Sequence, residues 1–168
     1  LVLQPETPFT DTARDAFDAV PQQGGTLVVA GDSLAWVLYT RELGLTVEPI
    51  RGAGPAASTP DNELGVAANF RYRLRADDAT PLLVLPDGDW VALRMPYKHG
   101  SLVVVASPVP LTNAGLGADE TARFVYREVL WGSPGGGGFV FDEAHHAFAP
   151  ATVADSNTLD QLVFTSPP

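Results

Sequence analysis

Continuous apolar runs predict three buried strands in this chain. Thr26–Ala30, Ser101–Ala106 and Phe139–Phe141 are apolar at nearly every position and show no alternation with polar residues. This pattern is typical of strands that are covered on both faces of a parallel sheet. We therefore expect the three runs to be parallel to one another and central in that sheet.

Helical patterns separate the predicted strands. Residues 10–20 form an amphipathic pattern with a capping Thr-Asp pair at its start. Gly31-Asp32-Ser33 follows the first buried run and predicts the cap of a second helix, which leads to a strand at Leu45–Ile50. Together these elements make one β-α-β unit with a right-handed crossover. The residues expected to face inward from the second helix are Leu34, Val37, Leu38 and Leu43.

The middle of the chain has the alternating pattern of antiparallel strands. Phe70–Arg75 alternates strictly between apolar residues and arginines, which predicts a half-buried strand. Leu82–Leu85 and Trp90–Met95 flank a turn that contains Asp87-Gly88, and this arrangement predicts a β-hairpin. The arginines on the polar face of the first strand are expected to be solvated, with anion binding as a secondary role; they are Arg71, Arg73 and Arg75.

These elements predict an α/β fold with a mostly parallel central sheet, helices on both sides and an antiparallel hairpin excursion. A length of 168 residues fits one domain, which we place at residues 1–150. Residues 151–168 show little pattern and are expected to form a C-terminal tail. The chain starts at Leu1 and ends in a polar segment that closes with two prolines. We expect it to be a piece of a longer protein, with the tail leading to a membrane segment outside this sequence.

Composition excludes several classes of function. The net charge of −10 disfavours binding to nucleic acid, to polyphosphates and to anionic membrane surfaces. The absence of cysteine excludes disulfides, thiolate metal sites and a cysteine nucleophile. Apolar residues make up 45% of the chain and charged residues 18%, which is typical of a globular domain.

The main candidate for chemistry is a cluster of acidic residues and histidines near the C-terminus. The run Phe139–Phe141 follows four glycines and ends in Asp142-Glu143-Ala144-His145-His146. A strand that ends in Asp-Glu-Ala-His also occurs in helicases, but those enzymes need a Gly-Lys-Ser/Thr phosphate loop. The only lysine here is Lys98, and no such loop exists, so a nucleotide-dependent helicase is excluded.

Three interpretations of this cluster remain open. The side chains can serve the local structure alone, as a cap and as hydrogen-bond donors to backbone carbonyls. Asp142, Glu143 and one of His145 and His146 also have the donor atoms for Zn²⁺ or Mn²⁺. Adjacent residues cannot all reach one ion, so a metal site would need a further carboxylate, such as Asp32 or Asp119.

The third interpretation is a serine esterase. Gly31-Asp32-Ser33-Leu34, at the end of a strand and the start of a helix, resembles the first block of the GDSL (SGNH) esterases. That resemblance implies Ser33 as the nucleophile, Asp142 and His145 as the orienting acid and the base, and Asn113 as an oxyanion donor. The Gly-x-Asn-Asp block of those esterases is absent.

A second resemblance covers Ser101 to about Phe148. Leu111-Thr-Asn-Ala-Gly-Leu116, a helix starting near Asp119, and a strand ending in Asp142-Glu143-Ala-His145-His146 resemble the family of domain of unknown function 4350. Ala147 departs from the usual glycine of that family. The resemblance implies a class I glutamine-amidotransferase-like fold without the nucleophilic cysteine. It also implies a domain that lies outside the cytoplasm, between two membrane helices. Genes of this family typically lie beside genes for AAA-type ATPases and other membrane-anchored proteins.

These observations together predict a membrane-tethered, extracytoplasmic and non-catalytic binding or scaffold module of a cell-envelope assembly. Its partners are expected to be other membrane or envelope proteins, and no nucleic acid, nucleotide or cofactor is expected. The esterase is the alternative function. If the module has a ligand site, we expect it at the carboxyl ends of the strands that end at Ala106 and Phe141. The residues expected to line it are Asn113, Asp142, Glu143, His145 and His146.

Overall fold

A computed structural model describes residues 1–51 and 56–130 of the chain. The strands are β1 (Val2–Leu3), β2 (Thr26–Ala30), β3 (Thr46–Pro49), β4 (Ala56–Ser58), β5 (Gly65–Ala67), β6 (Tyr72–Arg75), β7 (Thr80–Val84), β8 (Trp90–Tyr97) and β9 (Gly100–Val105). The helices are α1 (Asp11–Gln22), α2 (Leu34–Glu42), α3 (Asn113–Leu116) and α4 (Asp119–Phe124). A 3₁₀ turn, η1 (Val109–Leu111), precedes α3, and a π-helical segment, η2 (Val125–Leu130), continues α4.

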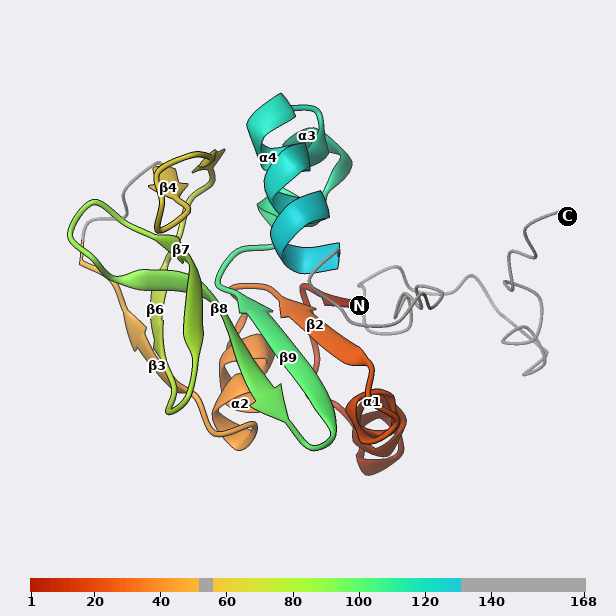
Figure 1. Ribbon diagram of the computed structural model, residues 1–168. Helices are drawn as coiled ribbons and strands as arrows, with labels where there is room; N and C mark the ends of the chain where they lie inside the picture. The colour runs from red at the N-terminus through yellow and green to blue at the C-terminus, as the bar shows by residue number, and fades with distance from the viewer. Residues whose placement is uncertain (52–55, 131–168) are drawn as a thin grey trace, which may run out of the picture.

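The strands form one mixed, curled sheet and one small sheet (Figure 1). The large sheet has the order β1-β2-β9-β8-β7-β4-β5. β1, β2 and β9 are parallel to one another, and every pairing from β9 to β5 is antiparallel. The small sheet pairs β3 with β6 in antiparallel orientation. β9 is therefore the strand at which a parallel part of the sheet meets an antiparallel part.

The predicted fold class, a mostly parallel amidotransferase- or flavodoxin-like sheet flanked by helices, is wrong. Only two of the six pairings in the large sheet are parallel, namely β1–β2 and β2–β9. Parallel strands need a long crossover connection, whereas antiparallel strands can be joined by short turns. The segment from β4 to β9 contains only short connections, so it adds antiparallel strands.

Two local predictions within this fold are confirmed. Thr26–Ala30 pairs in parallel with the run that starts at Ser101, in the register Thr26↔Ser101 to Ala30↔Val105. The hairpin of β7 and β8 also forms, and Gly88 at its tip has a φ of 87°, which favours glycine. Phe139–Phe141, the third run expected to be parallel, lies outside the described residues.

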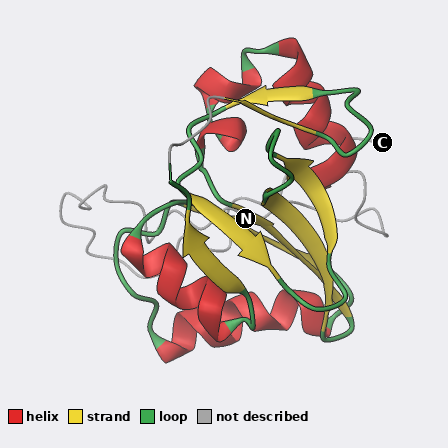
Figure 2. Cartoon of the chain, turned by 90° about the vertical axis from the view of Figure 1, so that its left-hand side faces the viewer, coloured by secondary structure: helices red, strands yellow, loops and turns green. Residues whose placement is uncertain are grey.

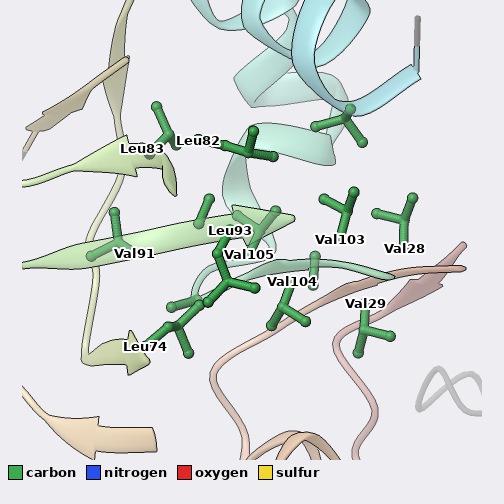
Figure 3. Close-up of a cluster of buried hydrophobic side chains, with 14 of the residues drawn as sticks. Val28, Val29, Leu74, Leu82, Leu83, Val91, Leu93, Val103, Val104 and Val105 are labelled. Atoms are coloured by element: carbon green, nitrogen blue, oxygen red, sulfur yellow. The ribbon is translucent and has the colours of Figure 1, made fainter. Parts of the chain in front are cut away.

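The continuous apolar runs are explained by helices on both faces of the sheet. Figures 1 and 2 show α1 and α2 along one face and α3 and α4 on the opposite face. Val28 and Val103 point to one side of the sheet, and Val29 and Val104 point to the other (Figure 3). All four valines are buried, because neither face of β2 and β9 is open to water. Every side chain of such a strand buries apolar surface, so apolar and polar residues do not alternate along it.

The inward face predicted for α2 is wrong for two of its leucines. Leu34 is 72% exposed and Leu38 is 45% exposed, whereas Trp36 is fully buried. Trp36 packs near Tyr72 of β6, with ring centroids 5.9 Å apart. A buried indole removes more apolar area from water than a leucine does, so the helix is rotated toward its aromatic residues.

Candidate functional site

The parallel part of the sheet brings three chain segments to one edge. β1, β2 and β9 all end there, and they are followed by Gln4, by Gly31-Asp32-Ser33 and by Ser107. This is the edge at which ligands bind in open α/β sheets, and it is the edge predicted from the sequence. Ser107 is buried, and its hydroxyl accepts a hydrogen bond from the Val109 amide at 3.3 Å.

Gln4 and Asp32 form a reciprocal pair across this edge. The Gln4 side-chain amide donates to Asp32 Oδ1 at 3.0 Å, and the backbone N–H of Asp32 donates to Gln4 Oε1 at 3.0 Å. Gly31 is packed closely beside them, since a Cβ atom there would lie 2.9 Å from Trp36 Cδ1. The chain therefore fills this edge with its own side chains. Gln4 was not predicted as a site residue, because nothing in the pattern of residues 1–5 connects it to the end of β2.

The Ser33 hydroxyl is the N-cap of α2. It accepts a hydrogen bond from the Trp36 amide at 3.1 Å and donates one to the carbonyl oxygen of Pro5. Thr10 caps α1 in the same way, with its hydroxyl accepting from the Ala13 amide at 3.3 Å. The hydroxyl proton of Ser33 is thus directed at a backbone carbonyl. Asp142 and His145, the other members of the proposed triad, lie outside the described residues.

The remaining site residues predicted from the sequence are only partly placed. Asn113 is exposed at the start of α3, where Thr112 provides the cap by accepting from the Gly115 amide at 3.2 Å. Glu143 and His146 lie outside the described residues, like the rest of the acidic-histidine cluster. Within residues 1–51 and 56–130, no three histidine or carboxylate side chains converge as metal ligands.

The three arginines of the alternating strand are largely exposed to solvent, as predicted, and they also form ion pairs with carboxylates. Arg73 contacts Glu48 of β3 at 2.7 Å and Asp89 of the β7–β8 turn at 3.3 Å. Arg75 contacts the same Asp89 at 3.2 Å. The hydrogen bonds that Arg73 donates to Glu48, and next to Asp89, raise the pKa of Arg73 above its usual value. Asp89 is only 15% exposed, so the arginines attach the small sheet to the hairpin of the large one.

The third arginine connects this network to the candidate site. Arg71 Nε lies 3.6 Å from Asp32 Oδ2. Asp32 therefore accepts a hydrogen bond from Gln4 on Oδ1 and has an arginine near Oδ2. A signal for these contacts was present in the sequence. Three arginines at alternate positions on one strand favour carboxylates on neighbouring elements, and two acidic residues flank Gly88.

Two surface grooves lie away from the sheet edge. One, of about 520 Å³, is lined by charged residues of β3, β6 and the β7–β8 turn, among them Glu48, Arg73 and Asp89. The other, of about 340 Å³, lies between Leu64 and the residues Arg123, Tyr126 and Arg127 of α4 and η2. Arg127 contacts Glu63 at 2.6 Å and Asp61 at 3.3 Å, which fixes the loop before β5 against η2.

No helix within the described part of the chain is long and apolar enough to cross a membrane.

Comparison with known proteins shows similarity of fold and assigns a family. No curated protein matches the chain. The mmIFT52 N-terminal domain superposes with a TM-score of 0.58 at 14% identity, over 82% of this chain and 78% of that one. The exo-β-1,4-mannosidase Op5Man5 from Opitutaceae bacterium strain TAV5 superposes with a TM-score of 0.52 at 17% identity, over 82% of this chain but only 25% of the mannosidase. At these identities the likeness concerns the fold alone.

The family assignment rests on the part of the chain before the acidic-histidine cluster. The match spans residues 1–127, which include the Leu111–Leu116 stretch but end before Phe139. The family expected from the sequence is therefore confirmed, while the Asp-Glu-x-His-His motif lies beyond the matched residues. The chain belongs to the family described as Domain of unknown function (DUF4350).

Proposed function

We propose that this chain is a non-catalytic binding module, carried on the extracytoplasmic side of a membrane-anchored protein and contacting other envelope proteins. The observation that supports a non-catalytic role is the closed edge of the parallel strands. The side chain of Gln4 is hydrogen-bonded to both the backbone N–H and the carboxylate of Asp32. The Pro5 carbonyl accepts a hydrogen bond from the Ser33 hydroxyl. The polar atoms at the usual ligand position are thus satisfied by the chain itself.

The energetics of Ser33 support the same conclusion. A serine nucleophile must hydrogen-bond to its base, at about 2.6–3.2 Å. Turning the Ser33 hydroxyl toward a base would break its bond to Pro5 and weaken the cap on the Trp36 amide. Each such loss costs about 1 kcal/mol. An active enzyme would have to repeat this rearrangement in every catalytic cycle.

Serine-dependent chemistry tests this proposal directly. We expect the full chain to be unlabelled by a fluorophosphonate probe and to hydrolyse p-nitrophenyl acetate no faster than its Ser33→Ala variant. Thr10→Ala is the matched control, because it also removes a helix cap but has no place in a triad. Labelling of the native chain that disappears in Ser33→Ala and persists in Thr10→Ala would replace the binding module with an esterase.

The esterase remains the second candidate because the position of Ser33 is favourable. Ser33 lies directly after a parallel strand and opens a helix, as the nucleophile of the GDSL (SGNH) esterases does. Its partners there would be Asp142 and His145, with Asn113 as oxyanion donor. If the chain is an esterase, His145→Ala should abolish labelling of Ser33 in the same experiment.

The cellular setting is proposed from the resemblance to the family, with the domain outside the cytoplasm and held by a membrane segment beyond this sequence. Its test uses the full-length protein in its own membrane. In intact spheroplasts, an externally added protease should degrade the domain. Protection in spheroplasts together with cleavage in inverted vesicles would place the domain on the cytoplasmic side instead.

The acidic-histidine segment is proposed as the ligand-binding part of the module. Asp142, Glu143, His145 and His146 combine carboxylates with imidazoles, and Asn113 adds an exposed amide. Crosslinking of the full-length protein to its envelope partners should decrease when His145 and His146 are both changed to alanine. Unchanged crosslinking would move the binding surface to another face.

A further inference from the structure

The smaller of the two surface grooves lies between the β4–β5 pair and the helical segment formed by α4 and η2. Arg123, Tyr126 and Arg127 line its helical side. These residues are three and four positions apart, a spacing that places side chains on one face of a helix. Leu64, which directly precedes β5, lines the groove as well. With a volume of about 340 Å³, the groove has room for a few side chains of a partner.

Hydrogen bonds hold the wall that carries Leu64 against the helix. Glu120 Oε2 of α4 accepts a hydrogen bond from the Gly65 amide at 2.9 Å, and α4 and the β4–β5 pair lie at the same end of the molecule (Figure 1). The Leu64 amide donates to Thr59 Oγ1 at 3.2 Å, and the Thr59 amide donates to the Leu64 carbonyl at 2.9 Å. The two walls are therefore joined before a partner binds, which reduces the entropy that binding costs.

The two arginines of the groove differ in their contacts. Arg127 contacts Glu63 and Glu128, each at 2.6 Å. It also contacts Asp61 at 3.3 Å, so its charge is balanced by carboxylates of this chain. Arg123 is exposed and forms no ion pair within the described part of the chain. Its guanidinium can therefore accept a carboxylate that a partner brings.

Apolar surface lies next to this cation. Tyr126 is 59% exposed, which is a large fraction for an aromatic side chain, whereas Leu64 is buried. Tyrosine is enriched at binding surfaces, because its ring packs against apolar groups while its hydroxyl stays in contact with water. Tyr126 and Arg127 also belong to the π-helical segment η2. Such segments are rare, and they occur frequently at functional sites.

We propose that this groove binds a linear peptide segment of a partner protein, in which a large apolar residue stands next to one aspartate or glutamate. The apolar side chain packs against Tyr126 and Leu64, and the carboxylate pairs with Arg123. A single carboxylate is favoured over an acidic run. The side chains of Asp61 and Glu63 are 49% and 63% exposed, and they would repel further negative charge.

This inference names a partner chemistry for the binding role proposed above, and it rests on that role. It uses no residue of the acidic-histidine segment and does not depend on the cellular location. The two surfaces are therefore tested separately. A failure of the groove to bind peptide leaves the crosslinking result for the variant with His145 and His146 changed to alanine unaffected.

Selection from a phage-displayed library of random heptapeptides tests the preference, with the full chain of 168 residues as bait. We expect the enriched sequences to carry Leu, Phe or Trp next to Asp or Glu. A synthetic peptide of the consensus sequence should bind the native chain in fluorescence polarisation. Arg123→Glu should weaken this binding by about tenfold or more, because an attractive charge pair becomes a repulsive one. Arg123→Lys keeps the positive charge and should retain most of the affinity.

The matched control is Arg51→Glu. Arg51 is exposed, forms no ion pair within the described residues, and lines the other groove together with Glu48 and Asp87. Its replacement changes the net charge of the chain as much as Arg123→Glu does. Because a distant surface charge is screened, Arg51→Glu should change the affinity by no more than about twofold. Circular dichroism of each variant establishes that it is folded.

Tyr126→Ala tests the apolar half of the site. It should weaken binding of the consensus peptide by about tenfold, because the apolar anchor loses the ring against which it packs. An affinity equal to that of the native chain would show that the peptide does not lie in this groove.

Three further results would overturn the proposal. They are a selection without enriched sequences, a consensus that lacks a carboxylate, and equal weakening by Arg123→Glu and Arg51→Glu. Sedimentation of the native chain with phosphatidylglycerol vesicles, lost in Arg123→Glu, would assign the groove to a lipid surface instead of a peptide.

Discussion

At the scale of single residues, the candidate site is defined by hydrogen bonds that hold it closed. Ser33 and Asp32 are residue types that often serve in catalysis, yet each has protein partners close by in sequence or across the sheet edge. The type of a residue is visible in the sequence, but its hydrogen-bond partner is not. Gln4 and Pro5 lie 28 residues before the groups that they contact, and no local pattern could have identified them.

The cap at Ser33 leads to a prediction about stability. Ser33→Ala should lower the free energy of unfolding by about 1 kcal/mol, because the Trp36 amide loses its acceptor and the Pro5 carbonyl loses its donor. Ser33→Thr keeps a hydroxyl and should retain most of the stability. Urea denaturation followed by tryptophan fluorescence measures both variants. Equal stability of Ser33→Ala and the native chain would show that the cap contributes nothing.

Tyr97 leads to a prediction about pH. Burial, the nearby charge of Asp18 and a 3.1 Å hydrogen bond to that carboxylate raise the pKa of Tyr97 to about 12. Because the folded pKa lies above the ordinary tyrosine value of 10.0, the neutral phenol is favoured by folding. Its contribution to stability is complete below pH 10 and is lost as the pH rises toward 12.

Ultraviolet titration and urea denaturation across that pH interval check this prediction. Tyr97→Phe should show a smaller loss of stability between pH 10 and 12 than the native chain does. Lys98 also contacts Asp18, so it must be retained in both proteins. An identical pH dependence in the two proteins would contradict the role assigned to Tyr97.

At the scale of elements, several strands were predicted near their observed positions, whereas β1, β4 and β5 were not predicted. The alternation in Phe70–Arg75 and the Asp-Gly turn depend on neighbouring residues, and both predictions hold. The rotation of α2 depends instead on what the helix packs against. Trp36 faces inward because Tyr72 and Gly31 offer it a buried surface, which the helix sequence alone does not reveal.

The ion pairs of β6 lead to a prediction at this scale. Asp89→Asn should destabilise the fold, because Arg73 and Arg75 both lose a charged partner at the hairpin tip. The loss should shrink as salt concentration rises, since half-exposed ion pairs are screened. Asp87→Asn is the control: its Oδ1 accepts from the Asp89 amide, and an asparagine oxygen can do the same. Urea midpoints at low and high salt should separate the two variants, and equal midpoints would contradict the prediction.

At the scale of the whole molecule, the error in fold class has a physical cause. Apolar runs in which no polar residues alternate indicate that both faces of a strand are covered, and β2 and β9 are covered in this way. They do not indicate the direction of the neighbouring strands, because Val91, Ala92 and Leu93 of β8 are also fully buried, yet β8 runs antiparallel to β9. Direction is set by the connections, and the short turns between β7, β8 and β9 were the better guide.

The position of β9 between two kinds of pairing has a consequence for the order of folding. β9 meets β8 through a two-residue turn, whereas it meets β2 across 75 residues of chain, at the 2.7 Å hydrogen bond between Thr26 Oγ1 and Ser101 Oγ. Local contacts form before distant ones, because closing a long loop costs more entropy. The β8–β9 hairpin should therefore be present in the folding transition state, and the parallel pairing of β9 with β2 should form after it.

In stopped-flow experiments, Leu93→Val in β8 should mainly slow folding, while Ser101→Ala should mainly speed unfolding. The reverse assignment would mean that this chain joins its distant strands first.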